Sequence, residues 1–117
     1  IAPVADTVFD FRQARTVAPL SPDLDNCFCV SRGAVPLREV LWLTGTSGLT
    51  LTVATTEAGV QVYDGRHAVR PGHAPFEGLA IEAQGWPDAP NKAGFPSIDL
   101  EAGETRTQIT EWRLSRP

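Results

Sequence analysis

The sequence predicts a mostly β chain, in which short strands form a sandwich or a barrel. The 117 residues include 10 glycines and 10 prolines, which interrupt any long helix. No run of about 12 residues carries the i, i+3, i+4, i+7 apolar spacing of an amphipathic helix. Residues 49–55 instead read LTLTVAT, and this alternation is typical of a β-strand.

The first two strands are predicted at residues 37–43 and 49–55. The segment Gly-Thr-Ser-Gly at residues 45–48 has the composition of a tight reversal, which predicts a β-hairpin. Further strands are expected at residues 60–63, 79–84 and 105–114, with turns at residues 64–65, 70–72 and 101–104.

Two segments are predicted to be irregular connections. Residues 17–26 and 85–97 are rich in proline, aspartate and glycine. Long loops on β scaffolds often line binding sites, so both segments are candidates for such a role.

Length and charge exclude several classes of protein. A chain of 117 residues supports one domain at most, so residues 1–117 form a single unit or part of one. The 14 acidic residues outnumber the 10 basic ones, and only one of these is a lysine, so nucleic acid is not an expected partner. No apolar run approaches the ~20 residues that span a bilayer, so a membrane is excluded as well.

The cysteines and the first residue bear on the compartment and on the extent of the chain. In an extended segment, Cys27 and Cys29 place their Cβ atoms roughly 6.6 Å apart, beyond the about 4.5 Å that a disulfide spans. Free thiols fit a reducing cytoplasm, where we expect the protein.

The chain begins Ile-Ala-Pro without Met or a signal peptide, so we interpret it as a piece of a longer product.

One polar side chain in the strand predicted at residues 79–84 suits acid–base chemistry. Leu79 and Ile81 face a core, whereas Glu82 faces the other way among small residues. Small neighbours leave room for a ligand, and partial burial would raise the pKa of the carboxyl toward a value useful to a general base. A solvated strand face is the alternative, and spacing does not decide between the two.

The strand predicted at residues 60–63 adds groups that suit a sugar. Gln61 and Tyr63 share the face opposite the inward-pointing valines. An amide, a phenol and a carboxylate match the donors and acceptors of sugar hydroxyls, and the ring of Trp86 offers an apolar surface to a sugar face. An ordinary polar sheet surface is the alternative.

Metal sites find little support in the sequence. Asp23 and Asp25 have a spacing that calcium loops also use, but the glycine and the distal glutamate of an EF-hand are absent. His67 and His73 have no His or Cys partner at ligand spacing and are expected to be exposed loop residues. No metal or organic cofactor is implied.

Four segments resemble the aldose 1-epimerase (galactose mutarotase) family. The run GLAIEAQGWPDAPNKAGFP at residues 78–96 is similar to a family signature in which Glu-x-Gln precedes Pro-Asp-Ala-x-Asn and Phe-Pro. The other three match family elements in order and spacing: DTVFDFR at residues 6–12, LDNCF at residues 24–28 and GVQVYDG at residues 59–65. Residues 100–114 also resemble the last strands of the family, so the resemblance spans nearly the whole chain.

The resemblance implies a fold and a set of roles. The fold would be a large antiparallel β-sandwich, with residues 1–117 as its C-terminal part. Glu82 would be the general base that acts on the anomeric hydroxyl, Asp25 would hold sugar hydroxyls, and Gln61 would line the pocket. Asn26 departs from the family, because many members have a histidine there.

The family's general acid and a substrate-holding arginine come from upstream motifs that these residues do not contain. We therefore expect an aldose 1-epimerase that acts on a hexose such as galactose or glucose when joined to the N-terminal half of the same domain. One alternative is a sugar- or sugar-phosphate-binding protein without turnover. The other is a structural half-sandwich whose exposed sheet edges pair with another segment.

Overall fold

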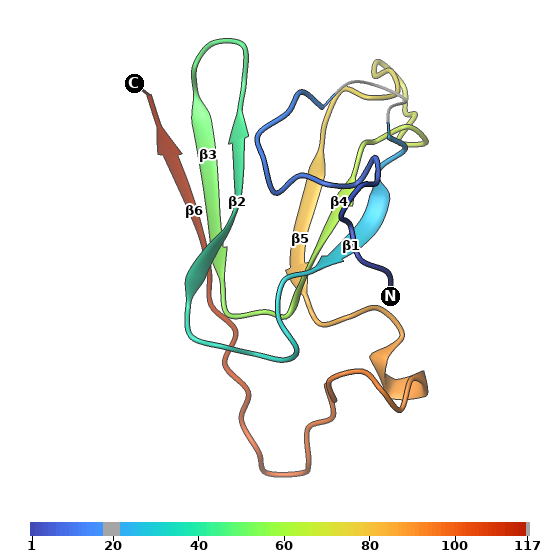
Figure 1. Ribbon diagram of the computed structural model, residues 1–117, viewed down its shortest axis with the longest axis vertical. Coiled ribbons are helices and arrows are strands. Elements are labelled where there is room, and N and C mark those ends of the chain that lie inside the picture. Colours follow the sequence, from blue (N-terminus) through green and yellow to red (C-terminus); the bar gives the residue numbers. More distant parts are fainter. Residues whose placement is uncertain (18–21, 117) are drawn as a thin grey trace. The chain divides into compact units, whose positions relative to one another are not determined.

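The computed structural model of the chain describes residues 1–17 and 22–116. These residues form two three-stranded sheets, which confirms the predicted all-β class (Figure 1). The strands are β1 (Asp25–Cys29), β2 (Arg38–Thr44), β3 (Thr50–Thr55), β4 (Gly59–Tyr63), β5 (Ala80–Gln84) and β6 (Thr110–Ser115). A 3-10 helix, η1 (Ala89–Asn91), lies in the second segment predicted to be irregular. No helix in this described part is long and apolar enough to cross a membrane.

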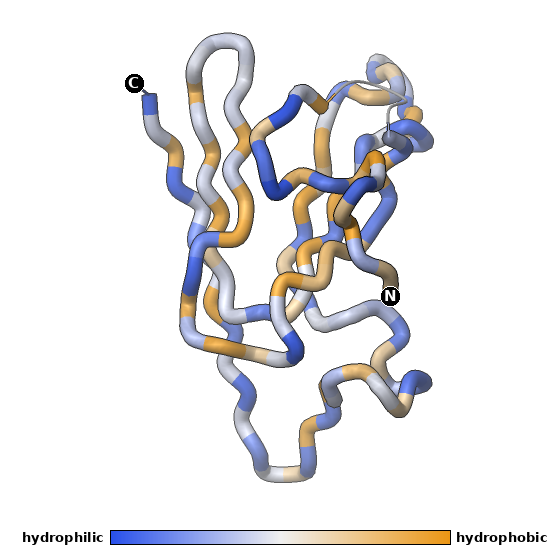
Figure 2. Tube along the Cα trace, viewed as in Figure 1, coloured by the Kyte–Doolittle hydropathy of each residue, from blue (hydrophilic) through white to orange (hydrophobic). Residues whose placement is uncertain are grey.

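The predicted hairpin is present as β2 and β3. The two strands pair antiparallel with Leu43 opposite Leu51, and Gly45 N donates a hydrogen bond to the Leu49 carbonyl at 2.9 Å. Gly48 has a φ of 79°, a conformation that favours glycine. Figure 1 shows the turn that joins the strands, and Figure 2 shows it as only weakly polar. The glycine-bracketed sequence therefore closes the reversal as predicted.

Strand β6 pairs antiparallel with β3 but is shorter than predicted. It begins at Thr110 and not at residue 105. Two side chains in the preceding segment are engaged elsewhere, because Arg106 pairs with Glu57 at 2.5 Å and Gln108 Nε2 donates to the Ala83 carbonyl at 3.0 Å. These contacts hold the segment away from a regular strand, so the predicted start of this strand is wrong.

The prediction that residues 17–26 are irregular is wrong at the end of that segment, where strand β1 begins. Its first two residues belong to the segment 17–26, which was predicted to be irregular; residues 18–21 of that segment lie outside the described part. The carbonyl of Leu24, just before β1, accepts a hydrogen bond from Asp64 N, just after β4, at 2.9 Å. The strand forms because its backbone finds partners on β4, which composition alone does not reveal.

Strands β1, β4 and β5 form the second sheet in that order. The start of β4 lies against the end of β5, since a Cβ added at Gly59 would be 3.3 Å from the Gln84 carbonyl oxygen. The residue after β4 lies against the segment before β5, since a Cβ at Gly65 would be 2.8 Å from the Gly78 carbonyl oxygen. Strands β4 and β5 therefore run antiparallel.

The chain divides into two compact units. The first consists of Ile1–Asn26 and Val62–Ile81, and the second of Cys27–Gln61 and Glu82–Pro117. The first unit buries the hydrophobic side chains of Leu24, Val62 and Ile81. The second unit buries those of Val53, Ala54, Ala58, Val60, Trp86 and Ala89. Each unit thus has apolar side chains of its own around which it packs.

Candidate functional site

Gln61 and Glu82 both belong to the second unit and lie beside one another on the neighbouring strands β4 and β5. Gly59 and Gln84 are in contact across β4 and β5. In an antiparallel pair, a step of two residues forward on one strand matches a step of two residues back on the other. Gln61 on β4 is therefore opposite Glu82 on β5. The structure therefore brings two of the three predicted site residues together.

The Glu82 carboxylate is open to solvent, so the partial burial that would favour a general base is absent in this chain. Glu82 is exposed, and no residue that the structure describes forms a hydrogen bond or ion pair with its carboxylate. The neighbouring Ile81 is buried, and so are Val60 and Val62 around the half-buried Gln61, as the predicted alternation requires. A carboxylate without a fixed partner can accept a proton from a bound hydroxyl group.

Asp25 belongs to the first unit, where it is the first residue of β1. It is exposed, and so is Asp23, whereas Leu24 between them is 2% exposed. This alternation is that of an extended segment, so the two carboxylates project from the same side of it. Asn26 Oδ1 accepts a hydrogen bond from Asp25 N at 3.3 Å.

An ion pair lies beside the segment that carries Asp25. Asp64 Oδ2 accepts a hydrogen bond from Leu24 N at 3.2 Å and another from Arg66 Nη2 at 2.6 Å. The side-chain hydrogen bonds from Arg66 lower the pKa of Asp64 to about 2, and they lower the pKa of Asp23 as well. The sequence indicated only a turn at residues 64–65 and gave no sign of this cluster.

The lowered pKa of Asp64 predicts a loss of stability in acid. In the unfolded chain this carboxyl takes up a proton near pH 4, whereas in the folded chain it stays charged down to a pH of about 2. The unfolded state binds more protons between these two pH values, so the free energy of unfolding falls as the pH falls from 4 to 2. Denaturant titrations of the complete protein at several pH values measure this slope. The slope should be smaller in Asp64→Asn, and an equal slope in both proteins would contradict the prediction.

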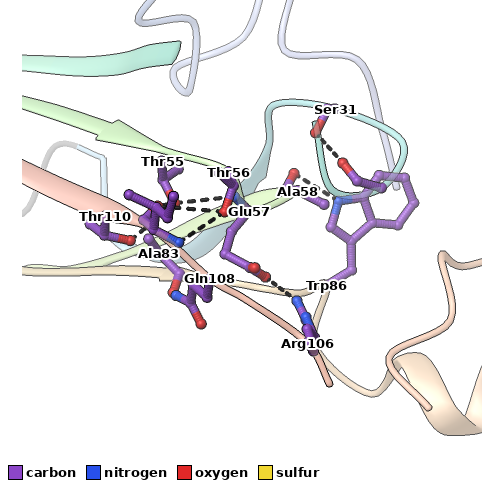
Figure 3. A network of polar contacts seen from close by, with 12 residues as sticks. Ser31, Thr55, Thr56, Glu57, Ala58, Ala83, Trp86, Arg106, Gln108 and Thr110 are labelled. Atoms are coloured by element: carbon purple, nitrogen blue, oxygen red, sulfur yellow. Dashed lines mark hydrogen bonds and ion pairs between the residues drawn. The ribbon is translucent and has the colours of Figure 1, made fainter. Parts of the chain in front are cut away.

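A cavity of about 350 Å³ lies in the second unit, and neither Gln61 nor Glu82 lines it. Buried Glu57 lines the cavity and pairs through Oε2 with Arg106 at 2.5 Å (Figure 3). Its Oε1 has no hydrogen-bond partner among the residues described. A buried, half-satisfied carboxylate is energetically unfavourable, and Arg106 offsets part of that cost. Sequence reasoning missed this pair because its members lie 49 residues apart.

Trp86 is a core residue that also lines this cavity, but it exposes too little of its ring for a sugar to stack on it. It is 5% exposed, and its Nε1 donates a hydrogen bond to the Ala58 carbonyl at 3.1 Å (Figure 3). The ring meets Phe95 edge-on, with centroids 5.1 Å apart. A sugar cannot stack on a buried ring, so the expectation of a stacking surface at Trp86 is wrong.

The two histidines are exposed, as predicted. His73 Nδ1 lies 2.8 Å from Glu77 Oε2, and His67 N donates a hydrogen bond to the Tyr63 hydroxyl at 2.7 Å. Within residues 1–17 and 22–116, no group of three or more His, Cys, Asp or Glu side chains could hold a metal ion. The His73 side chain thus contacts a neighbour four residues away, whereas this His67 contact uses only the backbone N–H.

Both cysteines are free thiols. Burial raises the pKa of Cys27 to about 11. The thiol is therefore protonated at neutral pH, where it is a poor nucleophile.

Comparisons with known proteins agree with the motif resemblance. A family model described as aldose 1-epimerase matches residues 1–113. The galactose mutarotase of Mus musculus is 32% identical over 130 residues, which cover 98% of this chain and 37% of that protein. The aldose 1-epimerase of Haemophilus influenzae is 35% identical over 130 residues, and that of Escherichia coli is 31% identical over 131 residues. Each of these matches covers 95% of this chain and 37% of the related protein. The chain thus spans 37% of the length of these relatives.

Proposed function

The chain belongs to the aldose 1-epimerase family, and we propose that it is the C-terminal part of a mutarotase that interconverts the α and β anomers of a hexose such as galactose or glucose. Residues 1–117 contribute one part of a single β-sandwich domain, and the N-terminal half contributes the rest of the site. The observation that carries the proposal is the exposed carboxylate of Glu82 beside the amide of Gln61.

In this proposal Glu82 is the general base. It takes the proton from the anomeric hydroxyl, and the electrons of that O–H bond form the C1–O1 double bond as the bond from C1 to the ring oxygen breaks. The ring oxygen receives a proton from a general acid supplied by the N-terminal half. Rotation about the C1–C2 bond and the reverse steps then close the ring as the other anomer. Proton transfer accounts for every step, so the scheme requires no metal or organic cofactor.

The roles of Gln61 and Asp25 follow from their chemistry. The amide of Gln61 can both donate and accept hydrogen bonds, which suits a sugar hydroxyl next to the reacting carbon. The Asp25 carboxylate accepts hydrogen bonds only, and such charged acceptors bind hydroxyls strongly. Free Cys27 and Cys29 fit the reducing cytoplasm that we propose as the location.

Polarimetry of freshly dissolved α-D-glucose and α-D-galactose tests the proposed function. The complete protein should accelerate the change in optical rotation, whereas the 117-residue chain alone should not, because the proposal places the general acid in the N-terminal half. A complete protein that binds sugar without accelerating the change would instead be a non-catalytic sugar-binding protein.

In the complete protein, we expect Asp25→Ala to raise KM by roughly 10- to 100-fold, since hydrogen bonds to charged groups contribute about 1.5–3 kcal/mol. Initial rates at several sugar concentrations measure the change. The matched control is Glu77→Ala, which removes another exposed carboxylate of the same unit. Unchanged kinetics in Asp25→Ala would remove this residue from the site.

A further inference from the structure

An arginine on the turn after β4 is folded back onto that turn. Arg66 N and Nε donate hydrogen bonds to Asp64 Oδ1 at 3.1 and 3.2 Å, and Arg66 Nη2 donates to Asp64 Oδ2 at 2.6 Å. Gly65 between them has a φ of 72°, which allows the tight reversal. The guanidinium and the carboxylate therefore form a planar, paired contact of fixed geometry.

The same guanidinium reaches a second segment of the chain. Arg66 Nη1 lies 2.6 Å from Asp23 Oδ2. The Arg66 side chain is 17% exposed, and its Cζ lies 5.9 Å from the centre of the Phe76 ring. A side chain that is largely buried, stacked and held by two carboxylates has little freedom to move.

Asp64 also binds the backbone of the segment that precedes Asp25. Its Oδ2 accepts a hydrogen bond from Leu24 N at 3.2 Å, and Asp64 N donates to the Leu24 carbonyl at 2.9 Å. Asp23 and Leu24 are thus both fixed to the turn of residues 64–66, and Asp25 is the next residue along the chain. All of these groups belong to one unit.

We propose that Arg66 is a positioning residue that, through Asp23 and Asp64, holds the backbone from which Asp25 binds the sugar. Arg66 does not touch the sugar. It fixes the direction of the Asp25 carboxylate before substrate arrives, so binding does not have to order that segment. The inference rests on the proposed role of Asp25.

A double-mutant cycle in the complete protein separates positioning from a merely structural role. We expect Arg66→Ala to raise KM by about tenfold with a smaller change in kcat, because misplacement of a binding group weakens substrate binding. In a protein that already carries Asp25→Ala, Arg66→Ala should raise KM no further. Arg66→Lys should restore part of the affinity, since a lysine can pair with one carboxylate but lacks the planar fork that pairs with two.

Arg70→Ala is the matched control, because it removes an exposed arginine of the same unit. Far-ultraviolet circular dichroism identifies variants that fail to fold. If Arg66→Ala fails to fold, the KM of Arg66→Lys is measured in its place. The inference is overturned if Arg66→Ala leaves KM unchanged, or if it raises KM equally with and without Asp25. If Asp25→Ala itself leaves KM unchanged, the proposed role of Asp25 has failed, and the positioning role fails with it. That result is distinguishable from failure of the positioning role alone.

Discussion

Glu82→Gln is expected to lower kcat of the complete protein by about 10²- to 10⁴-fold, the contribution typical of a general base. The amide keeps the shape of the side chain but cannot take the proton from the anomeric hydroxyl. The fold should be unaffected, because Glu82 is exposed and its carboxylate has no partner among the described residues. Polarimetry measures the rate, and thermal unfolding monitors the fold.

Glu111→Gln is the matched control for this variant. It makes the same change at an exposed position on strand β6 of the same unit. Turnover of Glu82→Gln at the rate of the control would remove Glu82 from its proposed role.

Gly65→Ala is expected to lower the free energy of unfolding of the complete protein by about 1–3 kcal/mol, the usual cost of a left-handed backbone conformation in a residue other than glycine. Gly65 has a φ of 72°, and an added Cβ would lie 2.8 Å from the carbonyl oxygen of Gly78. A backbone oxygen cannot move aside as the end of a flexible side chain can. Denaturant titration at neutral pH measures the loss.

Gly72→Ala separates the two causes. Gly72 has a φ of 81°, but no described atom lies within 4 Å of an added Cβ. Both variants carry the backbone strain, so the difference between them measures the contact with Gly78. Equal losses would show that this contact does not contribute.

The parts of the fold that were predictable from sequence are those specified by adjacent residues. The hairpin of β2 and β3 combines strict alternation with glycines at both ends of its turn, and these signals lie within residues 37–55. Strand β5 likewise places Ile81 inside and Glu82 outside, as period-2 alternation requires.

The parts that were not predictable depend on residues distant in sequence. Strand β1 forms against β4, and its first two residues come from a segment whose prolines and aspartates are typical of a loop. The segment before β6 is held by contacts of Arg106 with Glu57, 49 residues away, and of Gln108 with the Ala83 carbonyl. No local pattern reports such a partner.

The candidate site likewise has residues that the sequence predicts and residues that it does not. The motifs point to Glu82, Gln61 and Asp25, whereas the sequence shows Asp23 only as an aspartate two residues before Asp25. The structure shows that Asp23 is the partner of Arg66. An Asp-Gly-Arg turn is ordinary in sequence, and its significance depends on the segment that the folded chain places beside it.

The burial of Trp86 gives the three tryptophans different optical environments. Trp42 and Trp112 are 60% and 54% exposed, whereas Trp86 is 5% exposed. In this chain a water-soluble quencher such as iodide should reach the indoles of Trp42 and Trp112 and leave that of Trp86 emitting at shorter wavelength. The remaining emission then reports on the core of the second unit alone, next to the cavity lined by Glu57.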